Sequence, residues 1–362
     1  QGFTMSELFP FPLQPSSVAW PTQEWIIGDL SPSAKDGEIS SALGELFDHG
    51  VNPPVGKGIS LATVIIHRGK LVLERYGTQP DTAFGAGGPV DRDTTLISWS
   101  MAKSITQTVL AILLDEMGID VDSPVPIPEW SGDQRSTITW RHLLEMRDGL
   151  DFVEEYVVDE SGQSKSDVLE MLFGSGSSDV AKYARSRPLK HEPGSVWSYS
   201  SGSTNILCGL IKDLLGTTSL EDFLDQRIFT PLGMLSATAK FDEVGTFIGS
   251  SYVYATARDF ARFGYLYLRG GECESGQLLS REWVDAARWQ HAVDIESGHG
   301  YGQHWWIWKS LAGAMSAQGY EGQRTIVVPQ YDLVVVHLGK WVAETQPFLD
   351  VQLDRVVGAF AP

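Results

Sequence analysis

The chain has 362 residues and a formal charge of −19 at pH 7, from 27 Lys plus Arg against 46 Asp plus Glu. Hydrophobic residues make up 42% of it and charged residues 20%, which is the mixture of an ordinary globular protein. An acidic chain without a basic run is a poor candidate for binding nucleic acid or an anionic membrane surface. No stretch approaches the roughly 18 apolar residues that a membrane span needs. Composition therefore predicts one large globular domain or two fused lobes, with no nucleic acid and no membrane span.

The N-terminal segment is expected to be an extended arm. Residues 1–4 precede Met5 and are expected to be a tag remnant, so that the native start would be Met5. Residues 5–35 are rich in Pro, Ser and Trp without helical or strand periodicity, and Trp20 and Trp25 are expected to pin them to the surface. The segment has neither the basic region nor the apolar region of a signal peptide. This favours a cytoplasmic location, or a periplasmic or secreted one if a leader has been removed.

Strand patterns come early and late in the chain, and helical patterns lie between them. Two β-branched runs joined by a Gly-containing turn predict a β-hairpin, with strands at residues 61–67 and 71–76. Apolar periodicity and caps such as Gly118, Ser219 and Thr256 predict helices, at residues 39–49, 101–117, 139–146, 204–215, 220–229, 257–269, 281–289 and 345–359. Strands return at residues 303–309, 324–328 and 333–337.

This order of elements has one economical architecture. The two ends of the chain share one antiparallel sheet flanked by the terminal helices, and the helical stretch is an inserted lobe. The expected fold is thus α/β of the α+β kind, in one domain of residues 36–362. Its sheet lobe covers about 36–95 and 296–362, and its helical lobe about 96–295. Because ligand sites often lie where lobes meet, the chemistry is expected at that junction.

Several kinds of site are absent from the sequence. Cys208 and Cys273 are too few for a disulfide framework and form no zinc motif, so both are expected to be reduced thiols, in a helix and a loop respectively. The eight histidines are scattered, without metal-ligand spacing. There is no G-x-S-x-G or H-E-x-x-H motif, and residues 50–57 have the wrong spacing for a P-loop. No metal or cofactor is expected.

One motif carries chemistry: Ser100-Met101-Ala102-Lys103, an S-x-x-K at the start of an apolar helix. One helical turn places residues i and i+3 on one face, so the ammonium of Lys103 can reach the Ser100 hydroxyl. A serine needs a neighbouring base to become a nucleophile, and burial lowers the pKa of a lysine so that its neutral amine can serve. The helix N-terminus also favours a developing alkoxide. The alternative is a lysine that snorkels from the helix end.

Residues 100–106, Ser-Met-Ala-Lys-Ser-Ile-Thr, resemble the first motif of the serine β-lactamase and penicillin-binding-protein superfamily. The resemblance is greatest to its class C-like branch, which includes D-alanyl-D-alanine carboxypeptidases, β-lactamase-like esterases and 6-aminohexanoate-dimer hydrolases. Four more segments are similar to the family in the same order, namely residues 137–150, 192–201, 231–234 and 255–264. The resemblance covers most of the chain and implies a β-lactamase/transpeptidase-like fold.

The resemblance implies further site residues. Tyr199 would share the proton with Lys103, as a base in acylation and as an acid toward the leaving group. Ser201 stands where many relatives have an Asn that contacts the substrate amide, and it could donate a hydrogen bond at shorter reach. The third-motif region, residues 317–323, contains no Lys-Thr-Gly. The cation that commonly binds a substrate carboxylate is therefore missing from its usual place.

The third-motif region is also expected to contact the substrate through Gln318, Gly319 and Tyr320. Its glycines permit close backbone approach, and one N–H from Gln318 or Gly319, with that of Ser100, would form an oxyanion hole. Tyr156 is a substrate-binding candidate by similarity to the 6-aminohexanoate-dimer hydrolases, against the alternative of an exposed loop tyrosine. Trp99 is expected in the core rather than against the substrate.

These features predict a serine hydrolase that cleaves an amide or ester bond of a small molecule through an acyl-enzyme on Ser100. One alternative is a class C-like β-lactamase or D-alanyl-D-alanine carboxypeptidase with variant motifs. Another is a catalytically inactive penicillin-binding-like module, which the set of Ser100, Lys103 and Tyr199 disfavours. The sequence gives no indication of the oligomeric state or of the natural substrate.

Overall fold

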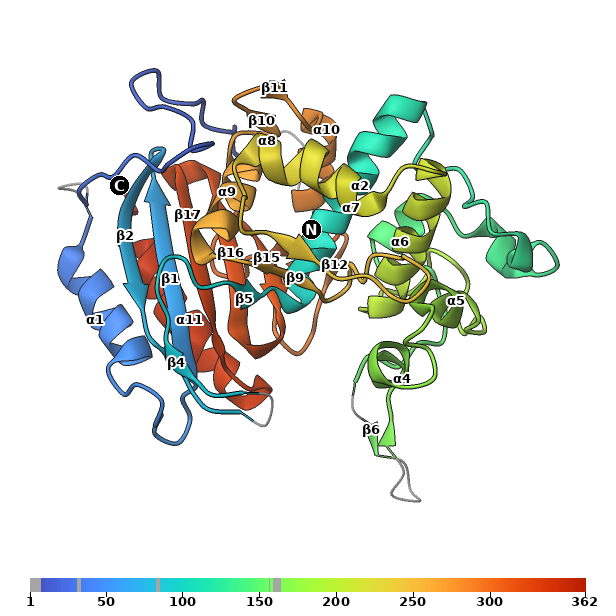
Figure 1. Cartoon of the computed structure of the whole chain (residues 1–362), viewed down its shortest axis with the longest axis horizontal. Helices are drawn as coiled ribbons and strands as arrows, with labels where there is room; N and C mark the ends of the chain where they lie inside the picture. The colour runs from blue at the N-terminus through green and yellow to red at the C-terminus, as the bar shows by residue number, and fades with distance from the viewer. Residues whose placement is uncertain (1–7, 31–33, 83–84, 156, 159–163) are drawn as a thin grey trace.

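The computed structural model describes residues 8–30, 34–82, 85–155, 157–158 and 164–362. Its centre is an eight-stranded antiparallel sheet in the order β12-β13-β14-β15-β16-β17-β1-β2 (Figure 1). The strands are β12 (Ala292–Val293), β13 (Gly300–Tyr301), β14 (Trp306–Ile307), β15 (Met315–Gly319), β16 (Gln323–Val328), β17 (Leu333–Lys340), β1 (Ile59–His67) and β2 (Lys70–Tyr76).

The sheet joins the two ends of the chain, as the sequence predicted. β1 pairs with β17 in a register that places Val64 opposite Val336, and β2 continues the sheet beyond β1. Every residue of β1 is buried, because the sheet is covered on both faces. This explains why its sequence is mostly apolar, with Ser60, Thr63 and His67 as exceptions, and lacks the regular alternation of a half-exposed strand.

Alternate residues of β17 mark the two covered faces. Val335 packs with the first and last helices, α1 (Asp36–Phe47) and α11 (Gln346–Gly358), whereas Val334 belongs to the larger core on the other side. That larger core contains α2 (Ala102–Met117) and α9 (Ala257–Leu268). Nearly the whole of α2 is buried, from Ala102 to Leu114, and its buried polar residues such as Gln107 and Thr108 have hydrogen-bond partners.

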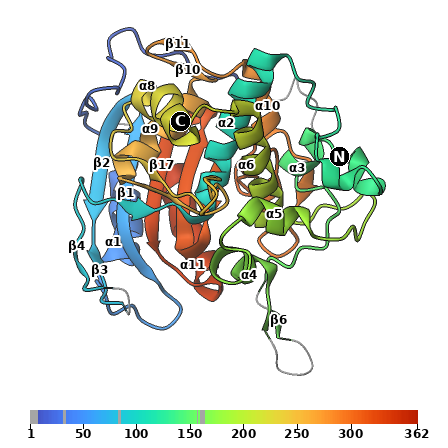
Figure 2. The ribbon, with the colours of Figure 1, turned by 45° about the vertical axis from the view of Figure 1, so that its right-hand side comes forward.

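Helices α3 (Trp140–Leu144), α5 (Val180–Arg185) and α6 (Ser201–Leu215) lie on the far side of α2 from the sheet (Figure 2). The described residues also form α4 (Asp167–Phe173), α7 (Leu220–Leu224), α8 (Thr230–Leu232), which packs against α9, and α10 (Arg281–Arg288). Small sheets join β3 (Thr78–Gln79) to β4 (Gly88–Pro89), β5 (Leu96–Ile97) to β9 (Val253–Ala255) and β8 (Thr238–Ala239), β6 (Val157–Val158) to β7 (Ser164–Lys165), and β10 (Glu272–Cys273) to β11 (Gly276–Gln277). Within the described ranges, no helix is long and apolar enough to cross a membrane.

The helices confirm the predicted caps but not every predicted boundary. Gly118 ends α2 in the left-handed conformation, and Ser219 and Thr256 cap α7 and α9. α6 begins at Ser201, three residues before the predicted start at 204, because Ser200 caps it by accepting a hydrogen bond from the Ser203 N–H. The helix predicted over 220–229 ends at Leu224 and continues as a π-helical turn, Asp225–Phe229. The predicted helix over 139–146 shortens to α3.

Other predictions were wrong in the same local way. The strand predicted over residues 303–309 shortens to β14, because the backbone turns at His304, which has a φ of 57°. Cys273 lies in β10 and not in a loop, whereas Cys208 lies in α6 as predicted, and both thiols are free. α9 comes from the predicted helical lobe yet packs against β1, β16 and β17. The lobe division near residues 96 and 295 therefore stays a proposal.

The N-terminal arm, residues 8–30, lies against α9 and its neighbours. Trp25 is 3% exposed, meets the Tyr265 ring edge-on at 5.4 Å and donates its indole N–H to the Arg258 carbonyl. Trp20 meets the same ring at 6.1 Å, so both tryptophans pin the arm as predicted. Three buried arginines also donate to arm carbonyls, namely Arg262 to Pro21 at 2.7 Å, Arg269 to Pro12 at 3.1 Å and Arg288 to Phe9 at 2.7 Å.

Trp25→Ala is expected to lower the free energy of unfolding by about 3–5 kcal/mol, the usual cost of truncating a buried tryptophan. Urea denaturation followed by circular dichroism measures the change. Leu13→Ala in the same arm is the control, because Leu13 is 73% exposed and its truncation removes little packing. Equal stabilities of the two variants would contradict a docked arm.

Candidate active site

The strained turn before α2 presents Ser100. Trp99–Met101 forms one 3₁₀ turn that leads directly into the buried helix α2. Trp99 has a φ of 44°, an uncommon value for a bulky residue that costs free energy unless the surroundings impose it. Such strained residues cluster at active sites. The turn therefore places the Ser100 hydroxyl at the N-terminal end of a rigid, buried element.

Lys103 lies one helical turn after Ser100 and is 1% exposed. Its Nζ donates to three oxygens at 3.0 Å each, those of the Ser100 hydroxyl, the Ser201 hydroxyl and the Ser250 carbonyl. Burial lowers the pKa of Lys103 to about 8, although the Glu154 carboxylate partly opposes this shift. The side chain does not snorkel to solvent. A neutral amine next to Ser100 is thus accessible close to neutral pH.

Glu154 is a site residue that sequence reasoning missed. Its two carboxylate oxygens accept from the Ser201 N–H and the Ser201 hydroxyl, each at 2.6 Å. Ser201 therefore connects Glu154 to Lys103, and in this arrangement its hydroxyl proton is directed to Glu154 rather than to a substrate. Glu154 precedes Tyr156 in the segment that the sequence analysis singled out.

Tyr199 lies beside the Ser100 and Lys103 pair. Lys103 Nζ is 4.9 Å from the centre of the Tyr199 ring, and Trp306 and Tyr301 hold the ring from other directions at 5.2 and 5.8 Å. Burial raises the pKa of Tyr199 well above its usual value, and a hydrogen bond with Ser100 only partly opposes the rise. The phenol therefore keeps its proton near neutral pH and can donate it.

The third-motif region runs along the other side of Ser100. β15 ends at Gly319, where a Cβ would lie 2.3 Å from the Ser98 carbonyl oxygen and 3.1 Å from the Ser100 nitrogen. Only glycine fits such a close approach. Tyr320 follows, and its ring meets that of Trp99 edge-on at 5.6 Å. The backbone of this stretch thus lies directly against Ser100.

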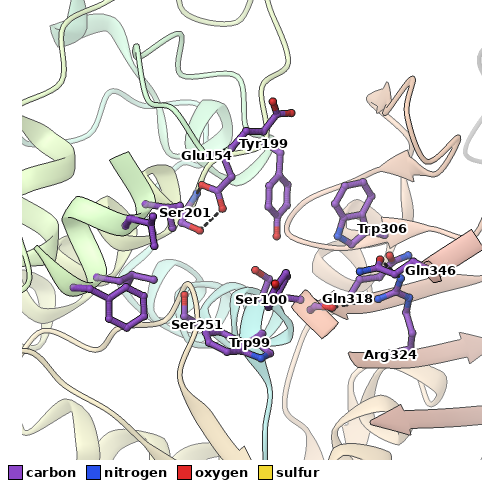
Figure 3. Close-up of a pocket in the computed structure, with 17 residues that line it drawn as sticks. Trp99, Ser100, Glu154, Tyr199, Ser201, Ser251, Trp306, Gln318, Arg324 and Gln346 are labelled. Carbon is purple, nitrogen blue, oxygen red and sulfur yellow. Dashed lines mark hydrogen bonds between the residues drawn. The ribbon is translucent and has the colours of Figure 1, made fainter. Parts of the chain in front are cut away.

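These groups surround one cavity of about 380 Å³. Figure 3 shows Ser100 in its middle, with Glu154, Ser201 and Tyr199 on one side and Trp306, Gln318, Gln346 and Arg324 on the other. The lining residues are Trp99, Ser100, Glu154, Glu155, Val168, Leu169, Leu172, Phe173, Tyr199, Ser201, Ser251, Trp306, Gln318, Gly319, Tyr320, Arg324 and Gln346. The cavity is mainly apolar and has charged groups at opposite sides.

The structure brings nearly all the predicted site residues together. Ser100, Tyr199, Ser201 and the stretch 318–320 line the cavity, and Lys103 lies directly behind Ser100. Tyr156 lies outside the described residues. The expectation that Trp99 belongs to the core was wrong: it lines the cavity, and its indole N–H donates to Glu321 at 3.1 Å.

Arg324 is a second site residue that sequence reasoning missed: it lies in the cavity wall on β16, outside the third-motif stretch, which has no Lys-Thr-Gly. A signal for it existed in the sequence, since an arginine inside the apolar run of β16 must be buried or functional. Gln346 and Trp306 gave no comparable signal, because their place depends on how α11 and β14 pack around the sheet. Among the described residues, no group of three or more His, Cys, Asp and Glu side chains could hold a metal ion.

Comparison with known proteins agrees with this geometry. A sequence model of the Beta-lactamase family matches residues 52–352. The 6-aminohexanoate-dimer hydrolase of Paenarthrobacter ureafaciens is 27% identical over 292 residues, which cover 76% of this chain and 72% of that protein. A Bacillus anthracis structure named as a candidate 6-aminohexanoate-dimer hydrolase has a TM-score of 0.72 at 21% identity, over 98% of this chain and 92% of that one. A family VIII carboxylesterase has a TM-score of 0.67 at 14% identity, over 92% and 99%. The superfamily and the fold predicted from the sequence are confirmed.

Gly319→Ala is expected to lower the rate of covalent modification of Ser100 by about 10²-fold, because the new methyl group pushes β15 away from the nucleophile and a shift of about 1 Å can cost that much. The rate of reaction with a fluorophosphonate measures it. Gly358→Ala is the control, since a Cβ there meets nothing within 4 Å. An unchanged rate in Gly319→Ala would contradict the close approach.

Proposed function

Because this chain belongs to the beta-lactamase family and is a serine hydrolase, we propose that it cleaves an amide or ester bond of a small molecule through an acyl-enzyme on Ser100. One observation carries the proposal. Lys103, whose pKa is about 8, lies 3.0 Å from the Ser100 hydroxyl in a cavity large enough for a small substrate. No metal or cofactor takes part in the proposed reaction.

The first step is acylation. The neutral amine of Lys103 takes the proton of Ser100, and the serine oxygen attacks the substrate carbonyl carbon. The carbonyl π electrons move to oxygen, and the resulting oxyanion is held by the N–H of Ser100 and by one N–H of residues 318–320. The apposition of Gly319 and Ser100 supports this assignment.

The second step expels the leaving group. Collapse of the tetrahedral intermediate breaks the bond to the amine or alkoxide, which needs a proton. Tyr199 donates it, since its raised pKa keeps the phenol protonated, and the proton held on Lys103 restores the phenol. This division makes Lys103 the base and Tyr199 the acid. In deacylation, Lys103 takes a proton from water, which attacks the acyl carbonyl carbon. The bond to Ser100 Oγ then breaks, the serine oxygen takes the proton back from Lys103, and the acid is released.

Amide and ester substrates suit the site better than β-lactams. The Asn of the second motif and the Lys-Thr-Gly of the third are both absent from this chain. A relative at 27% identity is named for 6-aminohexanoate dimer, and a structural neighbour is named as a carboxylesterase. Short ω-amino-acid amides and p-nitrophenyl esters are therefore the first substrates to screen. Faster turnover of nitrocefin than of either class would favour the β-lactamase alternative.

Treatment with a fluorophosphonate is expected to add one adduct to the wild-type chain and none to Ser100→Ala, because the Ser100 hydroxyl lies in the cavity 3.0 Å from Lys103, whereas the Ser201 hydroxyl donates to Glu154. Intact-mass spectrometry counts the adducts. Ser40→Ala on the exposed side of α1 is the control and should label like the wild type. An unlabelled wild-type protein would contradict the mechanism and favour an inactive penicillin-binding-like module.

The labelling rate is expected to rise with pH through a limb at about 8, where Lys103 loses its proton. Glu154→Gln should move this limb to lower pH. The carboxylate of Glu154 stabilises the ammonium and so raises the pKa of Lys103; its removal lets burial lower that pKa further. Glu155→Gln is the matched control, because Glu155 is an adjacent carboxylate that does not contribute to this shift. A limb that stays in place or moves upward in Glu154→Gln would refute the assignment of Lys103 as base.

A further inference from the structure

Two residues with long side chains, one on each side of the site, adopt the backbone conformation that favours glycine. Trp99, which precedes Ser100, has a φ of 44°, and Glu321, which follows Tyr320, has a φ of 60°. Such values cost free energy for these residue types and persist only where surrounding contacts impose them. Each of the two residues is next to a backbone segment that the proposed mechanism uses to hold the oxyanion.

The side chains of these two residues are bonded to each other. The indole N–H of Trp99 donates to Oε2 of Glu321 at 3.1 Å, across 222 positions of sequence. The bond therefore joins the turn before α2 to the turn after β15. A glycine at position 321 would adopt the same φ at no steric cost, but it would offer the indole no acceptor. A glutamate is explained there if its carboxylate has a role.

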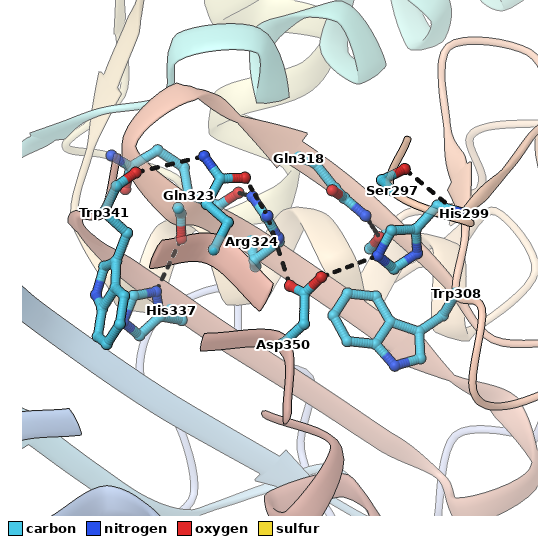
Figure 4. A network of polar contacts seen from close by, with 12 residues as sticks. Ser297, His299, Trp308, Gln318, Gln323, Arg324, His337, Trp341 and Asp350 are labelled. Atoms are coloured by element: carbon cyan, nitrogen blue, oxygen red, sulfur yellow. Dashed lines mark hydrogen bonds and ion pairs between the residues drawn. The ribbon is translucent and has the colours of Figure 1, made fainter. Parts of the chain in front are cut away.

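Glu321 is held in place from the side of β17. Its carbonyl accepts from the Trp341 N–H at 2.9 Å, and its carboxylate lies 3.4 Å from the ammonium of Lys340. The next carbonyl, that of Gly322, accepts from Nδ1 of His337 at 2.8 Å (Figure 4). β17 is an inner strand of the sheet and is almost fully buried. The carboxylate is thus presented to the indole from a rigid support.

Ser100 lies between the two turns that this bond connects. A Cβ on Gly319 would lie 3.1 Å from the Ser100 nitrogen, so a small shift of either turn changes how the two backbones meet. Glu321 is not among the residues that line the cavity around Ser100, and it lines a separate cavity of about 150 Å³ together with Lys340. Its effect on Ser100 therefore passes through Trp99.

We propose that Glu321 is a positioning residue for the nucleophile. By accepting from Trp99 it fixes the Ser100 hydroxyl and N–H against the backbone of residues 318–320, so that both proposed oxyanion donors keep their spacing. This inference rests on the proposed function. Donors that are already in place gain most when charge develops on the carbonyl oxygen, so the bond is expected to speed the covalent step and to leave the binding of the reagent nearly unchanged.

Glu321→Gly tests the inference, because it removes the carboxylate at a position whose φ suits glycine, so that the variant is expected to fold. Labelling by a fluorophosphonate at increasing concentrations gives a reversible binding constant and a maximal rate of covalent modification. The maximal rate should fall by about 10–100-fold, since a displacement of about 1 Å can cost 10²-fold. The binding constant should change by less than about threefold, because the lost contact acts in the transition state.

Three further variants separate the hydrogen bond from other roles of Glu321. Glu321→Asn tolerates the left-handed conformation but has a shorter side chain, so it should lose as much as Glu321→Gly without the freedom of a glycine backbone. Glu321→Gln keeps an accepting oxygen at the original length and should stay within about threefold of the wild-type rate. Lys340→Met removes the ion-pair partner and leaves the bond to Trp99, so it should label like the wild type.

A double-mutant cycle identifies the donor. Trp99→Phe keeps an aromatic ring and removes the indole N–H, so it should lower the maximal rate as Glu321→Gly does. The double variant should be no more than about threefold slower than the slower single variant, because both changes remove the same interaction. Effects that multiply in the double variant would overturn the inference.

Other results are equally decisive. A wild-type rate in Glu321→Gly or Glu321→Asn, a loss in Glu321→Gln as large as that in Glu321→Gly, or an equal loss in Lys340→Met would each overturn the positioning role while leaving the serine hydrolase intact. A wild-type chain that takes no label would overturn the proposed function and this inference together.

Discussion

The burial of one ammonium group determines the rest of the site. Lys103 is 1% exposed on a helix that is buried nearly from end to end, so its ammonium group has almost no contact with water. In that environment its charge is costly, so three oxygens must surround it at hydrogen-bond distance. One of these oxygens is the hydroxyl of Ser100, the proposed nucleophile. The same desolvation that threatens stability therefore makes a base available beside Ser100.

The sheet makes this burial possible. α2 contacts β15 of the sheet and the helix α6. α9 packs on β1, β16 and β17, so strands from both ends of the chain support the core around α2. The cavity opens where these parts meet, so its walls come from segments far apart in sequence: the turn at Ser100, the loop at Glu154, and strands β15 and β16. Their polar groups face one another across a largely apolar space.

The order of the main elements and the pair of Ser100 and Lys103 could be predicted from local sequence patterns. The spacing of Ser100 and Lys103 placed both on one face of a helix, and the apolar run after them implied burial. Glu154, Gln346 and Arg324 were not assigned, because their roles arise from contacts over long sequence separations. Predicted boundaries were wrong where a local conformation departed from the regular helix or strand, as at the π-helical turn after Leu224 and at His304, whose positive φ delays the start of the predicted strand to Trp306. The prediction for Trp99 was wrong because a large aromatic residue next to an apolar helix usually packs in the protein core.

The pairing of β1 with β17 has a consequence for how the chain is made. Ile59 is partnered by Lys340, and the arm that precedes β1 docks on residues more than 230 positions later. During synthesis the hairpin of β1 and β2 emerges early but finds no sheet to join until nearly the whole chain has left the ribosome. Until then a mostly apolar strand has an open edge, and a partly folded chain of this kind is prone to aggregate. Its high contact order also makes folding slow. A chain of this topology should depend on chaperones during expression more than its ordinary composition suggests.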